Sequence, residues 1–73
     1  MKIIQFADEF GRPAQARTDS IVAVLKGEAY VRSSLHPQGG YNPAVLLLEG
    51  GHRVETSTDY ETIVKNWATY HHR

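Results

Sequence analysis

The chain lacks cysteine altogether, and its 8 basic and 8 acidic side chains cancel to a formal net charge of zero. Without cysteine there is no disulfide framework, no cysteine-ligated zinc site and no thiol nucleophile. Small secreted domains commonly need disulfides, so their absence favours a reducing, cytoplasmic setting. Zero net charge argues against nucleic-acid binding, because such modules usually carry a clear basic excess.

Long apolar runs are also missing. The longest, Ile21–Leu25 and Ala44–Leu48, have five residues each, whereas a membrane-spanning helix needs about 20. The apolar start of the chain is too short for a signal peptide and ends at Asp8–Glu9. With 73 residues, 41% of them hydrophobic, the composition is that of one globular domain covering residues 1–73. We therefore expect a soluble protein that does not enter membranes.

Turn residues and period-two alternation predict an antiparallel sheet of about five or six short strands. The expected strands are Lys2–Phe6, Ala14–Arg17, Ile21–Leu25, Ala29–Leu35, Ala44–Glu49 and His52–Ser57. Lys26–Gly27 fits either a tight hairpin, with Val24 opposite Ala29, or a bulge. His36–Pro43 contains two prolines and two glycines, which predicts the longest loop.

The clearest hairpin signal is Gly50–Gly51 between two apolar segments. A Gly-Gly pair supplies positive φ at both central positions of a two-residue primed turn. That turn would place Leu47 opposite Val54 and Val45 opposite Thr56. Val45, Leu47 and Val54 would then face the core.

The same register would place Leu46 and Leu48 on the second face, opposite Glu55 and Arg53. A strand that is apolar on both faces is either covered twice or leaves an apolar stripe exposed. One core of this size supplies only a few kcal/mol of stability. We therefore expect a homo-oligomer, most simply a dimer, with Leu46 and Leu48 at the interface, Arg53 and Glu55 at its rim, and Tyr30 joining it. An unpaired sheet edge is a competing interface.

A helix is predicted at the C-terminal end of the chain. Thr58 and Glu61 fit a capping box, in which the hydroxyl and the carboxylate satisfy the first amides. The residues expected to pack on the sheet recur at helical spacing; they are Tyr60, Ile63, Val64, Trp67 and Tyr70 or His71. One such helix on an antiparallel sheet defines the α+β class.

No motif predicts a catalytic residue, a metal site or a cofactor. His71 and His72 are adjacent, so on a helix they point about 100° apart and cannot chelate together. His36 and His52 lie in different loops. Ser33–Ser34 lies beside His36 without the context of a nucleophile motif. We therefore expect a non-catalytic interaction or regulatory module.

Two other functions remain open. Tyr30, Arg32 and Arg53 on one sheet face could stack on and neutralise a nucleic acid, although Glu28 and Glu55 are expected near the same surface. Alternatively, the chain could be a small enzyme subunit whose site is completed by oligomerisation.

The stretch from Val45 to Thr56, followed by Ser57–Val64 and preceded by Ser20–Val24, resembles a bacterial strand–turn–strand–helix pattern. It is similar to small flagellar-operon proteins of the FlbD type and, more distantly, to the end of LytTR-type DNA-binding domains. The resemblance covers roughly the last forty residues and departs from both families in the loop His36–Pro43. The chain also lacks the basic surface of a LytTR-type module. The resemblance implies a small bacterial or phage accessory protein and transfers no functional residue.

Overall fold

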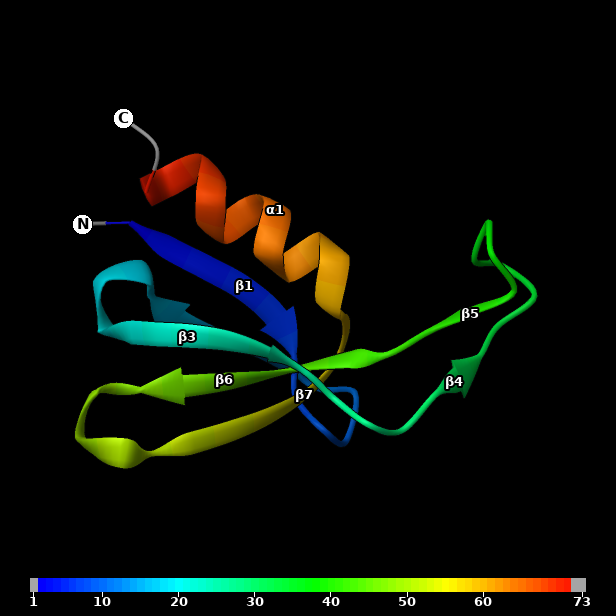
Figure 1. The fold of residues 1–73 in the computed structure, drawn as a ribbon, viewed down its shortest axis with the longest axis horizontal. Helices are drawn as coiled ribbons and strands as arrows, with labels where there is room; N and C mark the ends of the chain where they lie inside the picture. Colours follow the sequence, from blue (N-terminus) through cyan, green and yellow to red (C-terminus); the bar gives the residue numbers. More distant parts are fainter. Residues whose placement is uncertain (1, 72–73) are drawn as a thin grey trace.

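The computed structural model describes residues 2–71, with the side chains of residues 2–69 (Figure 1). Its strands are β1 (Ile3–Ala7), β2 (Pro13–Arg17), β3 (Ile21–Lys26), β4 (Val31–Arg32), β5 (Gly40–Tyr41), β6 (Pro43–Leu48) and β7 (Arg53–Asp59), followed by helix α1 (Tyr60–His71). The predicted α+β class is confirmed. The strands form three small antiparallel sheets, β1-β2, β3-β6-β7 and β4-β5, and not one continuous sheet.

One hydrophobic core joins the hairpin β1-β2, the sheet β3-β6-β7 and helix α1. Ile4 and Phe6 on β1 are 2% and 9% exposed, which confirms that they share a buried face. They pack with Leu46 of β6 and Ile63 of α1. In Figure 1, α1 runs along β1, and β2 lies behind β3. The hairpin and the helix therefore cover the same face of the three-stranded sheet.

The loop between β6 and β7 differs from the predicted two-residue turn. Glu49–Gly51 form a short 3-10 turn in which Gly50 and Gly51 both have positive φ. The Leu48 N–H donates to the His52 carbonyl at 2.8 Å, so three residues close the hairpin. The predicted register is therefore wrong by one residue, and a shift of one residue exchanges the two faces of a strand.

The observed register places Leu46 opposite Val54 and Leu47 opposite Arg53. Leu46 is 0% exposed, and Leu48 packs against the same core. The prediction that Leu46 and Leu48 form an interface is therefore wrong, because both side chains face the helix side of the sheet.

Strand β3 pairs with β6, so the hairpin predicted at Lys26–Gly27 does not form. The bulge alternative at that position is also wrong, because the irregularity lies between Ile21 and Ala23. Val22 is the extra residue there and is 57% exposed. A bulge twists a strand and interrupts its regular hydrogen bonding.

Only Val31–Arg32 of the predicted strand Ala29–Leu35 is a strand. It pairs with Gly40–Tyr41, which lies inside the predicted loop His36–Pro43. A two-residue strand inside a Pro- and Gly-rich segment has too little periodicity to be recognised from the sequence.

Strand β7 carries extra residues opposite Ala44, where its register with β6 shifts between Pro43 and Val45. The side chain of Thr56, which is 5% exposed, provides hydrogen bonds to the backbone at this irregularity. Its hydroxyl donates to the Ala44 carbonyl at 2.8 Å and accepts from the Thr58 N–H at 3.2 Å. The buried polar groups at the irregularity are thus hydrogen-bonded.

Helix α1 begins after Asp59 and not after Thr58 as the capping box predicted. Asp59 Oδ1 accepts from the Glu61 N–H at 3.0 Å, which is the N-cap interaction. Thr58 Oγ1 instead accepts from the Ala7 N–H at 2.8 Å and joins β1 to β7.

The helix packs as its apolar spacing predicted. Ile63 is 0% exposed, whereas Val64 and Trp67 are half-buried. The side chains of Tyr70 and His71, and residues 72–73, lie outside the described part of the chain. Within residues 2–71, no helix has the length and apolar character needed to cross a bilayer.

Candidate functional site

The face of the sheet β3-β6-β7 opposite the core is the first candidate surface. Val24 of β3 and Leu46 of β6 are paired and belong to the core, so their neighbours along each strand point to the other side. We call this side the outer face; its residues are Ala23, Leu25, Val45, Leu47, Arg53 and Glu55.

The outer face consists of two cross-strand rows. One row contains Ala23, Leu47 and Arg53, and the other contains Leu25, Val45 and Glu55. Leu25 is 42% exposed and Val45 only 7% exposed. The face is therefore apolar along β3 and β6 and charged along β7.

An open groove of about 650 Å³ lies at one end of the outer face. Leu25, Val45 and Pro43 form apolar parts of its wall, and the segment Lys26–Ala29 and Glu55 also line it. The groove thus has an apolar wall with charged groups of both signs around it.

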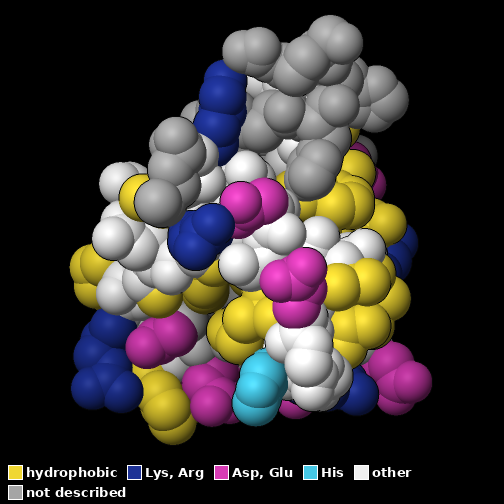
Figure 2. All heavy atoms as spheres, turned by 90° about the vertical axis from the view of Figure 1, so that its left-hand side faces the viewer, with side chains coloured by type: hydrophobic (Ala, Val, Ile, Leu, Met, Phe, Trp, Pro, Cys, Tyr) yellow, Lys and Arg dark blue, Asp and Glu magenta, His cyan; other side chains and the backbone are white. Residues whose placement is uncertain are grey.

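Charges elsewhere on the surface are likewise mixed. Figure 2 shows the end of the molecule that carries the β6-β7 turn, where Lys and Arg side chains alternate with Asp and Glu around hydrophobic patches. A surface that neutralises nucleic-acid phosphates needs clustered cations. The described residues at this end of the molecule do not form such a cluster.

The strands β4 and β5 form the second candidate surface, a ribbon that projects from the body on the side away from both termini (Figure 1). We call residues 30–41 the arm. Three of its apolar side chains are solvent-exposed: Tyr30 is 56% exposed, Val31 37% and Leu35 94%. The arm therefore presents apolar groups outward.

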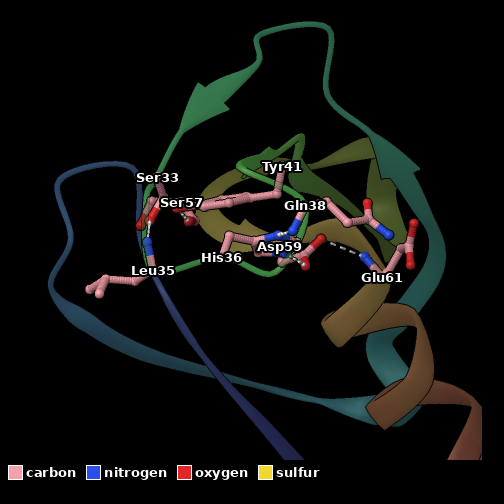
Figure 3. A network of polar contacts seen from close by, with 8 residues as sticks. All are labelled: Ser33, Leu35, His36, Gln38, Tyr41, Ser57, Asp59 and Glu61. Atoms are coloured by element: carbon pink, nitrogen blue, oxygen red, sulfur yellow. Dashed lines mark hydrogen bonds and ion pairs between the residues drawn. The ribbon is translucent and has the colours of Figure 1, made fainter.

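Polar contacts hold the arm loop against the start of α1 (Figure 3). His36 Nε2 lies 2.8 Å from Asp59 Oδ2. His36 Nδ1 accepts from the Gln38 N–H at 3.2 Å, which assigns the proton of the neutral imidazole to Nε2. Tyr41 Oη donates to the Ser57 carbonyl at 3.0 Å. Asp59 thus caps the helix with one carboxylate oxygen and holds the arm with the other.

The His36–Asp59 pair has the residue types of a catalytic dyad but not a free nitrogen. Both ring nitrogens of His36 already have partners within the fold, so the imidazole has no position left for a substrate proton or a metal. In the described part of the chain, no group of three or more His, Cys, Asp or Glu side chains could hold a metal ion. The geometry gives His36 a structural role.

Asn42 fixes the base of the arm. Its side-chain amide donates to the carbonyls of Gly27 and Ala29 at 3.0 and 3.1 Å, while its own carbonyl accepts from the Tyr60 N–H at 2.9 Å. The two ends of the arm are thereby joined to each other and to α1. The arm is held at its base and along its loop.

Asp8 organises the turn between β1 and β2. Its Oδ1 accepts from the N–H groups of Phe10 and Arg12, each at 2.9 Å. The Arg12 N–H, followed by the Phe10 N–H and the Arg12 guanidinium, holds the pKa of the Asp8 carboxyl below its ordinary value. The turn presents Phe10, which is 73% exposed, to solvent.

Asp8→Asn should therefore make the free energy of unfolding less dependent on pH in the acid range. A carboxylate with a lowered pKa in the folded state stabilises it above the unfolded value of about 3.9, and this stabilisation disappears as pH falls through the folded pKa. Asparagine can still accept the two hydrogen bonds but has no charge to titrate. At pH 6, the free energy of unfolding measured in urea should be higher for the unsubstituted chain than for Asp8→Asn. The difference should shrink towards pH 3; a difference that stays constant with pH would contradict this role.

The structure separates the residues predicted for nucleic-acid binding. Tyr30 adjoins β4 and Arg32 lies in β4, in the arm, whereas Arg53 lies in β7. All three side chains are exposed, but they belong to different sheets. The expectation that they share one sheet face is wrong.

Of the predicted interface residues, Arg53 and Glu55 lie together on the outer face, Tyr30 lies in the arm, and Leu46 and Leu48 face the core. Sequence reasoning missed two residues. Leu25 was expected in a strand with no particular role, and Leu35 was expected at the end of a strand. Leu25 was missed because the loop between β6 and β7 was expected to have two residues and has three, which exchanges the buried and the outer face of β6.

Comparison of the chain with protein-family models, with curated proteins and with solved structures finds no match. The resemblance to FlbD-type and LytTR-type proteins therefore stays a prediction.

Proposed function

We propose that this protein is a non-catalytic interaction module that forms a homodimer through its outer face. The carrying observation is the apolar outer face of β3 and β6, on which Leu25 of β3 is the most exposed apolar side chain and Val45 of β6 is already buried. The core-facing side is covered by α1 and by β1-β2, whereas on the outer face Leu25 is 42% exposed and Ala23 and Leu47 are half-buried. Burial of apolar surface contributes about 25 cal/mol per Å², so covering this face would add to the stability of a small core.

The charges of the outer face favour a second copy as the partner. Arg53 and Glu55 are two residues apart on the same side of β7, and both are exposed. A two-fold axis through the midpoint of this pair would place Arg53 opposite Glu55 of the second copy, and the reverse. With zero net charge, two copies approach without overall repulsion.

The edges of the sheet support association through a face more than association through an edge. Strand β3 is one edge, and its bulge at Val22 disturbs the regular donors and acceptors that an added strand needs. The opposite edge, β7, is partly occupied, because Thr56 forms a bridge with Asp8.

Leu25→Asp should dissociate the dimer. A buried charge without a partner opposes association, and two-fold symmetry introduces it twice. At about tenfold per copy, the dissociation constant should rise about a hundredfold. Sedimentation velocity should show a dimer for the unsubstituted chain and a monomer for the variant at the same concentration.

Ile3→Asp is the matched control, because Ile3 is an aliphatic strand residue of nearly equal exposure, 40%, on the hairpin β1-β2. It should leave the dimer intact. A monomeric unsubstituted chain, or equal dissociation by both variants, would refute the proposal. The placement of the protein in the cytoplasm and its bacterial or phage origin stay predictions.

A further inference from the structure

A small cavity lies between the arm and the start of helix α1. Its lining comes from the end of β3, from the arm and its base, and from the junction of β7 with α1, and its volume is about 70 Å³. A water molecule takes about 30 Å³, so the cavity has room for about two waters or for one molecule of the size of glycine. We call it the arm cavity.

Three of the four tyrosines of the chain line the arm cavity, namely Tyr30, Tyr41 and Tyr60. Two of these rings are held in place. The Tyr41 hydroxyl donates to the Ser57 carbonyl, and the Tyr30 ring packs so closely on Gly40 that a Cβ atom there would lie 2.6 Å from it. The face of a tyrosine ring attracts a cation, so this wall suits a ligand with an ammonium group.

Two carboxylates, those of Asp59 and Glu61, line the same cavity. Both oxygens of Asp59 already have partners, His36 and the Glu61 N–H. The Glu61 side chain is exposed, and among the described residues it forms neither a hydrogen bond nor an ion pair. Figure 3 shows it on the same side of the His36–Asp59 pair as the Gln38 side chain. Glu61 is therefore the carboxylate that is available to an ammonium group.

Lys26, at the end of β3, adds a cation to the lining of the arm cavity. Its side chain is exposed and has no ion pair within the described part of the chain, so it does not neutralise Glu61. The cavity thus carries one available group of each sign. A ligand of one sign is attracted by one of these groups and repelled by the other, whereas a zwitterion pairs with both.

We propose that the arm cavity binds a small zwitterion, an α-amino acid of the size of glycine. Its ammonium group pairs with Glu61 and lies against the tyrosine rings, and its carboxylate pairs with Lys26. Asn42 and the His36–Asp59 pair hold the arm in place, so the cavity exists before the ligand binds and little ordering opposes binding. The outer face does not contribute to the described lining of this cavity, so the site goes beyond the proposed homodimer and does not depend on it.

Titration of the chain with glycine tests this site. At constant pH and ionic strength, the NMR resonances of the His36 imidazole and of the tyrosine rings should shift and then saturate. Methylammonium and acetate each carry only one of the two charged groups, so each should bind at least about tenfold more weakly than glycine. Glu61→Gln and Lys26→Gln each remove one charged partner, and each should raise the dissociation constant of glycine about tenfold.

Glu28→Gln and Lys65→Gln are the matched controls, because both residues are exposed and lie outside the described lining of the arm cavity. They should leave the dissociation constant of glycine unchanged, and circular dichroism should show every variant folded. Shifts that do not saturate, or equal affinity for glycine, methylammonium and acetate, would overturn the proposal. Substitutions of Glu61 and Lys26 that weaken binding no more than the controls would also overturn it. A monomeric chain that binds glycine refutes the proposed function but supports this site.

Discussion

Leu46→Ala is expected to lower the free energy of unfolding by about 2–5 kcal/mol, the range for truncating a buried leucine. Leu46 is 0% exposed and belongs to the same core cluster as Ile4 and Ile63. A chain of this length, at about 0.05–0.15 kcal/mol per residue, has about 4–11 kcal/mol in total. The substitution should therefore remove a large part of the stability.

Leu47→Ala is the matched comparison, because it makes the same change one residue further along β6. Leu47 is half-buried on the outer face, so its loss should be about 1 kcal/mol in the monomer. Urea unfolding at low protein concentration gives both values without a contribution from dimerisation. Equal losses, or a larger loss for Leu47→Ala, would contradict the observed register and support the two-residue turn that the sequence predicted.

Gly40→Ala is expected to separate β4 from β5. A Cβ atom at this position would lie 2.6 Å from the Val31 carbonyl oxygen and 2.6 Å from the Tyr30 ring. The Val31 oxygen belongs to the paired strand and cannot move without opening the ribbon, so we expect a local destabilisation of about 1–3 kcal/mol. The arm should become a preferred site of proteolytic cleavage while the core stays folded.

Gly39→Asn provides the control for this substitution. Gly39 has φ of +80°, and a Cβ there would meet no atom within 4 Å. Asparagine tolerates this left-handed conformation, so the arm should stay closed. Limited proteolysis followed by mass spectrometry distinguishes the two variants. Cleavage of both at the same rate would show that the close packing of Gly40 does not hold the arm.

Local chemistry predicted most of the elements of this fold. Alternation of Ile4 and Phe6 identified β1 and its buried face, and apolar spacing identified the face of α1 that contains Ile63. Gly50–Gly51 identified the last hairpin and the positive φ of both residues. These features depend on residues near one another in the chain, which is why the sequence alone was sufficient.

The register of β6 against β7 could not be predicted in the same way. Two- and three-residue loops both accept Gly50–Gly51, and Leu46 and Leu47 are equally apolar. The choice between them depends on packing against β1, β3 and α1, which no local pattern records. As a result, the sequence correctly indicated that β6 is apolar on both faces, whereas the face that it assigned to the interface was wrong.

The arm was missed for a different reason. Its strands have two residues each, and its loop is held by His36–Asp59, a contact between residues 23 positions apart. The helix N-cap was mispredicted for the same reason. Thr58 fits a capping box in the sequence, but its hydroxyl accepts a hydrogen bond from the Ala7 N–H and does not cap the helix. Long-range hydrogen bonds decide both, and local sequence patterns contain no sign of them.

The most direct test of association through the outer face is a dilution series followed by methyl NMR. Resonances of Ala23, Leu25, Val45 and Leu47 should shift as the dimer dissociates. Methyl groups of the core, such as those of Ile4 and Ile63, should shift little. Spectra that do not change with concentration, or changes confined to α1 and β2, would contradict the account.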